Sequence, residues 1–201
     1  MALLIPLSDL DYGEEEVAAV QRVLRNKWLS MGPETKAFEE EFATMAGTRH
    51  ACAVSNGTAA LHLAFLALGL GPGDEVIQPA VNFVAAANMT KAIGATPVFG
   101  EIAGMDEPTL DPAEIERLMT PHTKAVVVMH YGGYFCRMVE IQEICRKHHL
   151  ALIEDACHAV GATCPLASAS VAAGALGDIG CFSFFSNKNL VTGEGGMDQV
   201  L

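Results

Sequence analysis

The sequence predicts an α/β fold of three layers, α-β-α, with a mostly parallel β-sheet between two layers of helices. Short apolar runs without polar alternation, such as residues 124–129 and 150–153, are typical of strands that are buried on both faces. Helical patterns separate these runs, as in βαβ units. With 201 residues, the chain is long enough for one large core and too short for two full domains.

Two helices are predicted first along the chain. Glu14–Asn26 places Val17, Val20 and Leu24 on one face, at the spacing of an amphipathic helix. Pro33–Ala46 begins with proline, which suits the first turn of a helix because it needs no N–H partner there. After residue 46 the pattern changes to apolar runs that alternate with helices.

The remaining elements are predicted from this alternation. Strands are expected at residues 50–54, 75–78, 96–99, 124–129, 150–153 and 180–184. Helices are expected at residues 57–68, 82–93, 112–119 and 139–149. Residues 165–177 are rich in Ala, Ser and Gly and carry no charge, which predicts a loop.

Composition excludes several classes of protein. The formal net charge of −12 argues against a nucleic-acid surface, which would need clustered basic residues. Apolar stretches are interrupted well before the roughly 20 residues of a membrane span. The N-terminal segment lacks the basic start and cleavage site of a signal peptide, so a cytoplasmic protein with free thiols is expected. None of the six cysteines forms a C-x-x-C pair, and no metal site is expected.

Polar residues follow three of the predicted strands. They are the residues of Ser55-Asn56-Gly57-Thr58, then Asp155 and His158, then the segment from Ser183 to Lys188. The carboxyl ends of parallel strands meet at one edge of a sheet, where α/β proteins bind ligands. The sequence therefore predicts one ligand site that is built from three separate segments.

The first segment, residues 55–58, suits a phosphate. Gly57 permits a tight turn, Thr58 adds a hydroxyl, and a helix N-terminus presents unpaired N–H groups. A plain capped helix start remains an alternative, since Ser, Asn and Thr all cap helices well. Neither a G-x-G-x-x-G nor a G-x-x-x-x-G-K-[ST] pattern occurs, so nucleotide cofactors are not favoured.

The second segment places a carboxylate after an uncharged strand. Asp155 requires a cationic or hydrogen-bonding partner there, and a protonated pyridine nitrogen would serve. His158, three residues later, is expected to contact the same ligand. A solvent-facing acid and a core histidine are the alternatives.

The third segment delivers Lys188 from an apolar strand into a Gly-rich stretch. Apolar surroundings lower the pKa of a lysine and make it a usable nucleophile and base. Ser183 offers a further phosphate contact, and Phe83, after another strand, is expected to stack on an aromatic ring. An exposed loop lysine and a core phenylalanine are the alternatives.

These blocks resemble a known family. V-S-N-G-T-A-A-L-H-L-A, G-P-G-D-E-V-I, M-H-Y-G-G-Y, L-I-E-D-A-C-H-A and G-D-I-G-C-F-S-F-F-S-N-K-N-L-V-T-G-E-G-G-M occur in the order seen in the DegT/DnrJ/EryC1/StrS sugar aminotransferases. Members of this family are fold-type I enzymes that depend on pyridoxal 5'-phosphate (PLP). They carry a smaller C-terminal domain after the lysine segment, so the resemblance implies that residues 1–201 are a truncated PLP-binding large domain.

The resemblance also implies a role for each candidate residue. Lys188 matches the lysine that forms the Schiff base with PLP. Asp155 matches the partner of the pyridine nitrogen, and His158 the residue near the ring hydroxyl. The remaining matches are to phosphate contacts and to the aromatic that stacks on the ring: Gly57, Thr58 and Ser183, and Phe83.

The implied reaction moves an amino group from an amino acid, usually glutamate, to a nucleotide-linked keto sugar, in a homodimeric enzyme. Two alternatives remain open. One is a PLP-dependent sugar dehydratase, although relatives of that type often replace the lysine by histidine. The other is a non-catalytic remnant or interaction module of the same family.

Overall fold

The computed structural model describes residues 8–166 and 169–200. Its elements, in order, are α1 (Glu14–Asn26), α2 (Pro33–Ala46), β1 (His50–Val54), α3 (Gly57–Ala67), β2 (Glu75–Pro79), α4 (Ala85–Ala92), β3 (Thr96–Gly100), α5 (Pro112–Leu118), β4 (Thr123–Met129), a short 3-10 helix (Tyr131–Gly133), α6 (Met138–His148), β5 (Ala151–Asp155), β6 (Thr163–Leu166), β7 (Ala169–Ala172), β8 (Ile179–Ser183) and β9 (Gly196–Val200).

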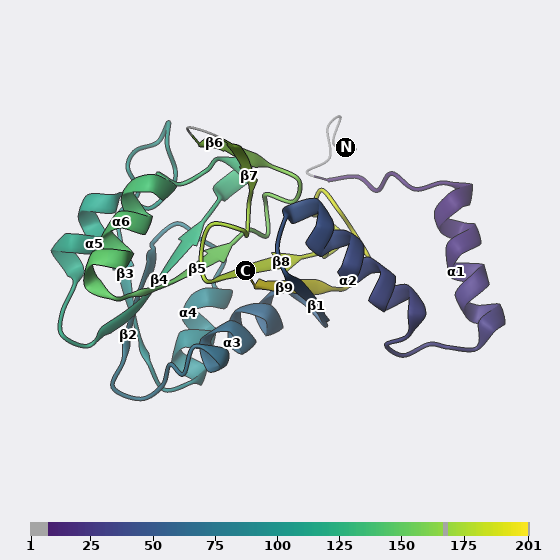
Figure 1. The fold of residues 1–201 in the computed structure, drawn as a ribbon, viewed down its shortest axis with the longest axis horizontal. Coiled ribbons are helices and arrows are strands. Elements are labelled where there is room, and N and C mark those ends of the chain that lie inside the picture. The colour runs from purple at the N-terminus through teal and green to yellow at the C-terminus, as the bar shows by residue number, and fades with distance from the viewer. Residues whose placement is uncertain (1–7, 167–168, 201) are drawn as a thin grey trace, which may run out of the picture.

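One large sheet forms the middle layer, with the strand order β1-β9-β8-β5-β4-β2-β3. The pairs β2–β3, β2–β4, β4–β5 and β5–β8 are parallel, whereas β9 pairs antiparallel with both β1 and β8. In Figure 1, α3 and α4 lie on one side of this sheet and α5 and α6 on the other. The predicted three-layer fold with a mostly parallel sheet is confirmed.

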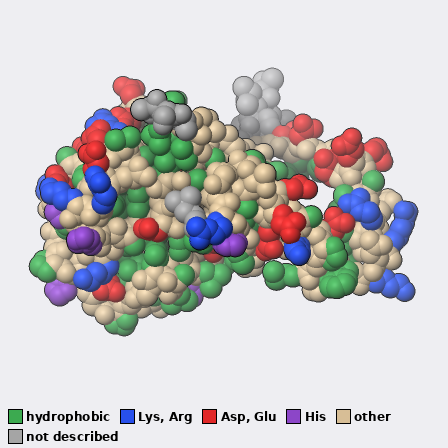
Figure 2. All heavy atoms as spheres, in the orientation of Figure 1, with side chains coloured by type: hydrophobic (Ala, Val, Ile, Leu, Met, Phe, Trp, Pro, Cys, Tyr) green, Lys and Arg blue, Asp and Glu red, His purple; other side chains and the backbone are tan. Residues whose placement is uncertain are grey.

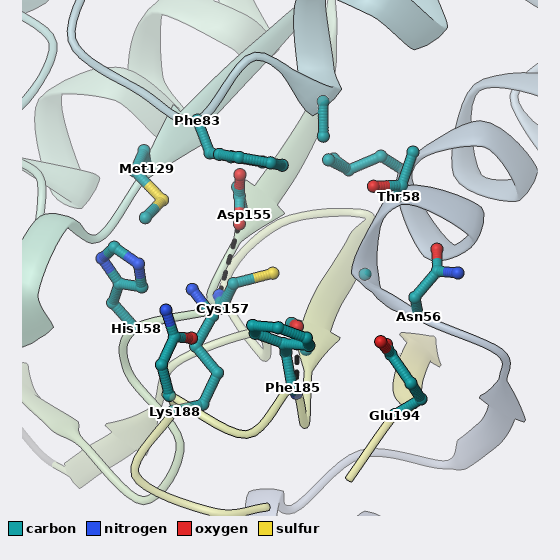
Figure 3. A pocket seen from close by; sticks show the side chains of 15 residues that line it. Asn56, Thr58, Phe83, Met129, Asp155, Cys157, His158, Phe185, Lys188 and Glu194 are labelled. Atoms are coloured by element: carbon teal, nitrogen blue, oxygen red, sulfur yellow. Dashed lines mark hydrogen bonds between the residues drawn. The ribbon is translucent and has the colours of Figure 1, made fainter. Parts of the chain in front are cut away.

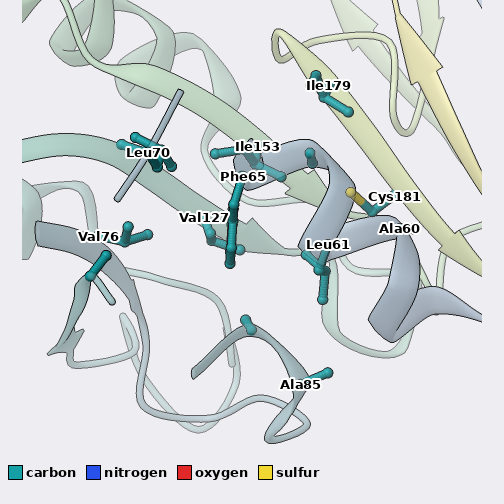
Figure 4. Close-up of a cluster of buried hydrophobic side chains, with 14 residues drawn as sticks. Ala60, Leu61, Phe65, Leu70, Val76, Ala85, Val127, Ile153, Ile179 and Cys181 are labelled. Atoms are coloured by element: carbon teal, nitrogen blue, oxygen red, sulfur yellow. The ribbon is translucent and has the colours of Figure 1, made fainter. Parts of the chain in front are cut away.

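Two apolar clusters fix the helices to the sheet. Leu61 and Phe65 of α3 pack on Val127, Ile153 and their neighbours on one face of the sheet (Figure 4). On the opposite face, the side chains of α5 and α6 cover the alternate residues of β4 and β5. Residues 126–129 are at most 1% exposed, which explains why this strand carries no polar alternation.

The first helix differs from the others because it does not contribute to the core. Val17, Val20 and Leu24 form the predicted apolar face, but they are 39%, 60% and 56% exposed. Figure 1 shows α1 standing apart from the sheet, joined to α2 by an extended connection. Acidic and basic side chains are interspersed on the face shown in Figure 2, including those of α1 and α2. No helix in residues 8–166 and 169–200 has the length and hydropathy needed to cross a bilayer.

Three details of the predicted elements are corrected. The loop predicted at residues 165–177 is wrong in part, since β6 and β7 pair antiparallel there, and residues 167–168 lie outside the described residues. Strand β9 was not predicted, because it begins within a Gly-rich motif whose pattern is that of a loop. Helix α4 begins at Ala85 rather than at Asn82, because the Asn82 side chain accepts a hydrogen bond from the Phe83 N–H at 2.6 Å, which favours a turn.

Gly180 of β8 is a position where only glycine fits. A Cβ atom there would overlap the backbone of Gly174, which belongs to the turn before β8. We expect Gly180→Ala to lower the free energy of unfolding by about 1–3 kcal/mol, because backbone atoms have to move. Urea denaturation measures this change. Gly104→Ala is the matched control, since its Cβ meets nothing within 4 Å, and a change of more than about 0.5 kcal/mol there would contradict the argument.

Asp198 makes β9 sensitive to pH. It lies between Cys52 of β1 and Cys181 of β8, and its Oδ1 has no hydrogen-bond partner within the described part of the chain. Burial raises the pKa of Asp198 to about 7, above its ordinary value of about 3.9. The folded state therefore binds the proton more tightly, and the free energy of unfolding falls as pH rises from about 4 to about 7.

Asp198→Asn is expected to remove this dependence, because the amide has a similar shape and no charge. Urea denaturation at pH 5 and pH 8 should show a smaller loss of stability with rising pH in Asp198→Asn than in the unmodified chain. Asp106→Asn, at an exposed position, should leave the loss unchanged. If the free energy of unfolding depended equally on pH in all three proteins, ionisation of Asp198 would not destabilise the fold, and the argument would be wrong.

Candidate active site

A pocket of about 510 Å³ opens at the carboxyl ends of β4, β5 and β8, beside the N-terminus of α3. Every residue that the sequence singled out lines it: Gly57, Thr58, Phe83, Asp155, His158, Ser183 and Lys188. Figure 3 shows Thr58 and Asn56 on one side of the pocket and His158 on the other, with Asp155 between them. The fold thus brings together segments that lie up to 131 positions apart, from Gly57 to Lys188.

The N-terminus of α3 forms one wall of the pocket. The Asn56 side chain accepts a hydrogen bond from the Ala59 N–H at 2.9 Å and caps the helix. Within the described residues, the N–H groups of Gly57 and Thr58 have no hydrogen-bond acceptor. Capping and anion binding are therefore compatible here, because the cap occupies a different N–H group.

Gly57 allows the helix to approach the sheet closely. A Cβ atom at this position would lie 2.9 Å from the Ser183 Cβ and 3.0 Å from the Cys157 Sγ. Gly196 has the same effect from β9, where a Cβ would lie 2.5 Å from the Asn56 carbonyl carbon. These glycines bring the unpaired N–H groups of α3 next to the Ser183 hydroxyl.

Asp155 ends β5 and is 3% exposed, so the solvent-facing alternative is wrong. The Asn82 Nδ2 donates to its Oδ2 at 3.2 Å, and the Cys157 N–H donates to its Oδ1 at 3.3 Å. Each carboxylate oxygen keeps a lone pair for a ligand. Asp155 thus presents a hydrogen-bonded carboxylate at the base of the pocket.

His158 stands on the flank opposite α3 and is half-buried. Burial lowers the pKa of His158, the charge of Lys188 lowers it further, and Asp155 acts in the opposite direction. The Gly132 N–H donates to its Nδ1 at 3.4 Å, and the Tyr131 ring meets the imidazole edge-on. The core alternative for His158 is wrong, because this side chain lines the pocket.

Lys188 lies in a loop that backbone hydrogen bonds close. The Lys188 N–H donates to the Phe185 carbonyl at 2.9 Å, and the Phe184 N–H donates to the Gly195 carbonyl at 2.8 Å. The Asn189 Nδ2 donates to the Val160 carbonyl at 2.9 Å, which joins the loop to the segment that carries His158. The lysine is partly buried, so the alternative of a freely exposed loop lysine is also wrong.

Phe83 is 67% exposed and lines the pocket, so its core alternative is wrong. Figure 3 shows its ring lying across the pocket near Asp155, on the side away from Lys188. An aromatic face at this position is available for stacking on a flat ligand.

A family comparison decides what kind of protein carries this pocket. The model of the DegT/DnrJ/EryC1/StrS aminotransferase family matches residues 10–198. The chain belongs to that family. Its members are PLP-dependent, and the predicted resemblance is confirmed.

Individual DegT/DnrJ/EryC1/StrS relatives support the assignment. The chain is 48% identical to the spore coat polysaccharide biosynthesis protein SpsC of Bacillus subtilis (strain 168), over 92% of this chain and 46% of that protein. It is 48% identical to the GDP-perosamine synthase of Caulobacter vibrioides, over 85% of this chain and 45% of that protein. The chain spans about half the length of the relatives it matches.

Solved structures place the fold in the same group. The aminotransferase TlmJ from Streptoalloteichus hindustanus superposes with a TM-score of 0.91 at 41% identity, over 98% of this chain and 53% of that one. The PLP-form of the sugar aminotransferase Spr1654 from Streptococcus pneumoniae superposes with a TM-score of 0.91 at 29% identity, with the same coverage. The structural neighbours are fold-type I aminotransferases, as the sequence predicted.

The groups in the pocket fit the cofactor of the DegT/DnrJ/EryC1/StrS family. In PLP the aldehyde is opposite the pyridine nitrogen, and the hydroxyl and the phosphate arm flank the aldehyde on either side. The pocket offers an amine from Lys188, a buried carboxylate from Asp155, and unpaired N–H groups from Gly57 and Thr58. Within the described residues, no group of three His, Cys, Asp or Glu side chains is arranged to hold a metal ion.

Sequence reasoning missed part of the site. Asn82 directly precedes Phe83, yet its bond to Asp155 joins positions 73 residues apart and has no local signal. Glu194 and Asn187 belong to the lysine motif and line the pocket without having been assigned a role. Asn56, Cys157 and Phe185 line the pocket as well and lie in predicted segments without an assigned role, and the lining residues outside those segments are Leu61, Ala85 and Met129.

Proposed function

We propose that residues 1–201 are the PLP-binding large domain of an aminotransferase that moves an amino group from an amino acid to a nucleotide-linked keto sugar, with glutamate as the expected donor. The observation that carries the proposal is the convergence of Lys188, Asp155 and the N-terminus of α3 on one pocket. The names of the relatives, which concern polysaccharide and perosamine synthesis, favour a sugar acceptor.

In this proposal each residue has a distinct task. Lys188 holds the cofactor through its amine, and the same Nζ then moves the proton at Cα of the amino-acid donor. Asp155 keeps the pyridine nitrogen protonated, since a buried carboxylate favours a cation beside it. PLP, when bound, serves as the electron sink that stabilises a carbanion at Cα.

Three further groups hold the cofactor in place. The N–H groups of Gly57 and Thr58, with the Thr58 and Ser183 hydroxyls, bind the phosphate. Phe83 covers the ring and keeps water from that face. The His158 side chain contacts the ring hydroxyl.

The surroundings of the site favour a larger assembly. Phe83, Tyr134 and Phe185 are 67%, 62% and 42% exposed, and Phe83 and Phe185 line the pocket itself. The proposed cofactor ring accounts for the exposure of Phe83, so Tyr134 and Phe185 are the aromatic side chains left for another chain to cover. We therefore expect a homodimer. We place the protein in the cytoplasm, where its six free thiols would stay reduced.

The experiment is a titration of the purified chain with PLP, followed by glutamate. We expect a band at longer wavelength than that of free PLP, and we expect glutamate to convert the bound cofactor into pyridoxamine phosphate, which chromatography separates. A band that glutamate leaves unchanged would support the dehydratase alternative. Protein that shows only the spectrum of free PLP, and loses it on gel filtration, would support a remnant that binds no cofactor.

A further inference from the structure

A buried acid–histidine pair lies directly behind the pocket. Glu154 and His130 are both 0% exposed, and the Nε2 of His130 lies 2.8 Å from the Glu154 Oε2. Glu154 precedes Asp155 on β5, and successive side chains of a strand point to opposite faces. The Glu154 carboxylate thus faces away from the pocket, and the roles proposed above do not use it.

Four donors converge on the Glu154 carboxylate. The N–H groups of Leu176 and Gly177 donate to Oε1 at 2.6 and 2.5 Å, and the Gly174 N–H donates to Oε2 at 3.0 Å. His130 is the fourth donor. Four donors fill the four acceptor sites of the carboxylate, so its hydrogen-bonding capacity is fully satisfied.

The second ring nitrogen of His130 shows which form the imidazole takes. The Cys136 N–H donates to the His130 Nδ1 at 3.3 Å, so that nitrogen carries no proton. The tautomer that fits both contacts has its proton on Nε2, pointing at Glu154. The two bonds fix His130 between β5 and the start of the segment that leads to α6.

The residues that follow His130 form a turn that contacts His158 in the pocket. The His130 N–H donates to the Asp155 carbonyl at 3.2 Å, and the His130 carbonyl accepts from the Gly133 N–H at 3.1 Å. Gly132 has φ +60° and Gly133 has φ +85°, which are left-handed conformations that favour glycine. This tight turn presents the Gly132 N–H to the Nδ1 of His158 at 3.4 Å.

The contact with the Gly132 N–H bears on the protonation of His158. An N–H that donates to Nδ1 leaves the proton of a neutral imidazole on Nε2 and opposes protonation of the ring. The other titratable groups that face His158 are Lys188, Asp155 and Tyr131. Burial lowers the pKa of His158 most, the Lys188 charge lowers it further, and Asp155 raises it.

We propose that the buried His130–Glu154 pair is a positioning device: it fixes the 131–133 turn so that the Gly132 N–H keeps His158 neutral, with Nε2–H free to donate to a ligand oxygen. The ligand oxygen is of the hydroxyl or phenolate class. Its assignment to the ring hydroxyl of PLP rests on the proposed function, whereas the coupling between Glu154 and His158 does not.

The test uses the chain without PLP, labelled with ¹⁵N at histidine. Long-range ¹H–¹⁵N spectra across a pH series report the protonation of each ring nitrogen, and His158→Gln identifies the resonances of His158. We expect the unmodified chain to show a His158 ring that is neutral at pH 7, with the proton on Nε2. A proton on Nδ1, or a charged ring at pH 7, would overturn the proposal.

Two variants are expected to disrupt the positioning of the Gly132 N–H, one at the buried pair and one in the turn itself. Glu154→Gln replaces an acceptor by an amide whose NH₂ opposes the N–H donors around it, and Gly132→Ala strains the turn at a φ of +60°. Both are expected to raise the pKa of His158 toward that of an exposed imidazole. Their matched controls, Glu143→Gln on the exposed face of α6 and Gly69→Ala at a φ of +72° in open space, should leave it unchanged.

Gly132 is exposed, so Gly132→Ala keeps the proposal testable even if Glu154→Gln fails to fold. An unchanged His158 titration in folded Gly132→Ala, or an equal shift in Gly69→Ala, would refute the coupling. If the variants behave as expected and the chain binds no PLP, the proposed function fails and the positioning role stands. If PLP binds and the pKa of His158 is unchanged in the variants, the positioning role fails and the proposed function stands.

Discussion

Lys188→Ala is expected to remove the long-wavelength absorption band of the PLP-loaded chain. That band requires a carbon–nitrogen double bond between the cofactor and an amine, and Lys188 is the amine that the pocket supplies. Asp155, Thr58 and Ser183 remain in the variant, so PLP that is still bound non-covalently should show the spectrum of the free aldehyde. Conversion of the cofactor by glutamate should fall by about 10²–10⁴-fold, since a positioned proton carrier is lost.

The control for this prediction is Lys36→Ala. Lys36 lies on α2, its side chain is 77% exposed, and within the described residues it forms a salt bridge with Glu40 on the same helix. The Lys36 variant should bind PLP with an unchanged spectrum. A Lys188→Ala protein with the same band as Lys36→Ala would show that the cofactor is attached elsewhere, and the assigned site would then be wrong.

Glu154→Ala is expected to lower the free energy of unfolding by about 3–5 kcal/mol. The variant leaves His130 and three backbone N–H groups buried without their acceptor, and such groups cannot regain water without opening the fold. The loss is large beside the total stability of about 5–15 kcal/mol that is typical of a domain. Urea denaturation followed by circular dichroism measures it.

Glu143→Ala gives the comparison for Glu154→Ala. Glu143 is exposed on α6, so its removal should change the free energy of unfolding by less than about 0.5 kcal/mol. If Glu154→Ala were no more destabilising than Glu143→Ala, the carboxylate would not hold the turn at residues 174–177. The positioning role of the His130–Glu154 pair would then lose its basis.

Much of the site followed from sequence because of one property of parallel sheets. The carboxyl ends of β5 and β8 meet at one edge, so polar residues that directly follow their apolar runs are neighbours in space. Asp155 and Ser183 needed no other information to be placed together. The strands themselves were readable because burial on both faces leaves a run without polar interruptions.

The features that sequence did not predict depend on contacts between distant residues. Strand β9 follows two glycines, begins at a third, Gly196, and contains Asp198, so its pattern does not differ from that of a loop. Its pairing with β1 joins residues about 150 positions apart along the chain, from His50 to Val200. Glu154 gave no sign of being fully buried, because its donors come from residues 130 and 174–177.

The central claim is that Lys188 holds PLP in this pocket. The most direct measurement is reduction of the PLP-loaded chain with borohydride, which makes the link to a lysine permanent, followed by digestion and mass spectrometry of the peptides. The account predicts a single modified peptide, the one that contains Lys188. Modification of a different lysine, such as Lys91 or Lys124, or label spread evenly over several lysines, would contradict it.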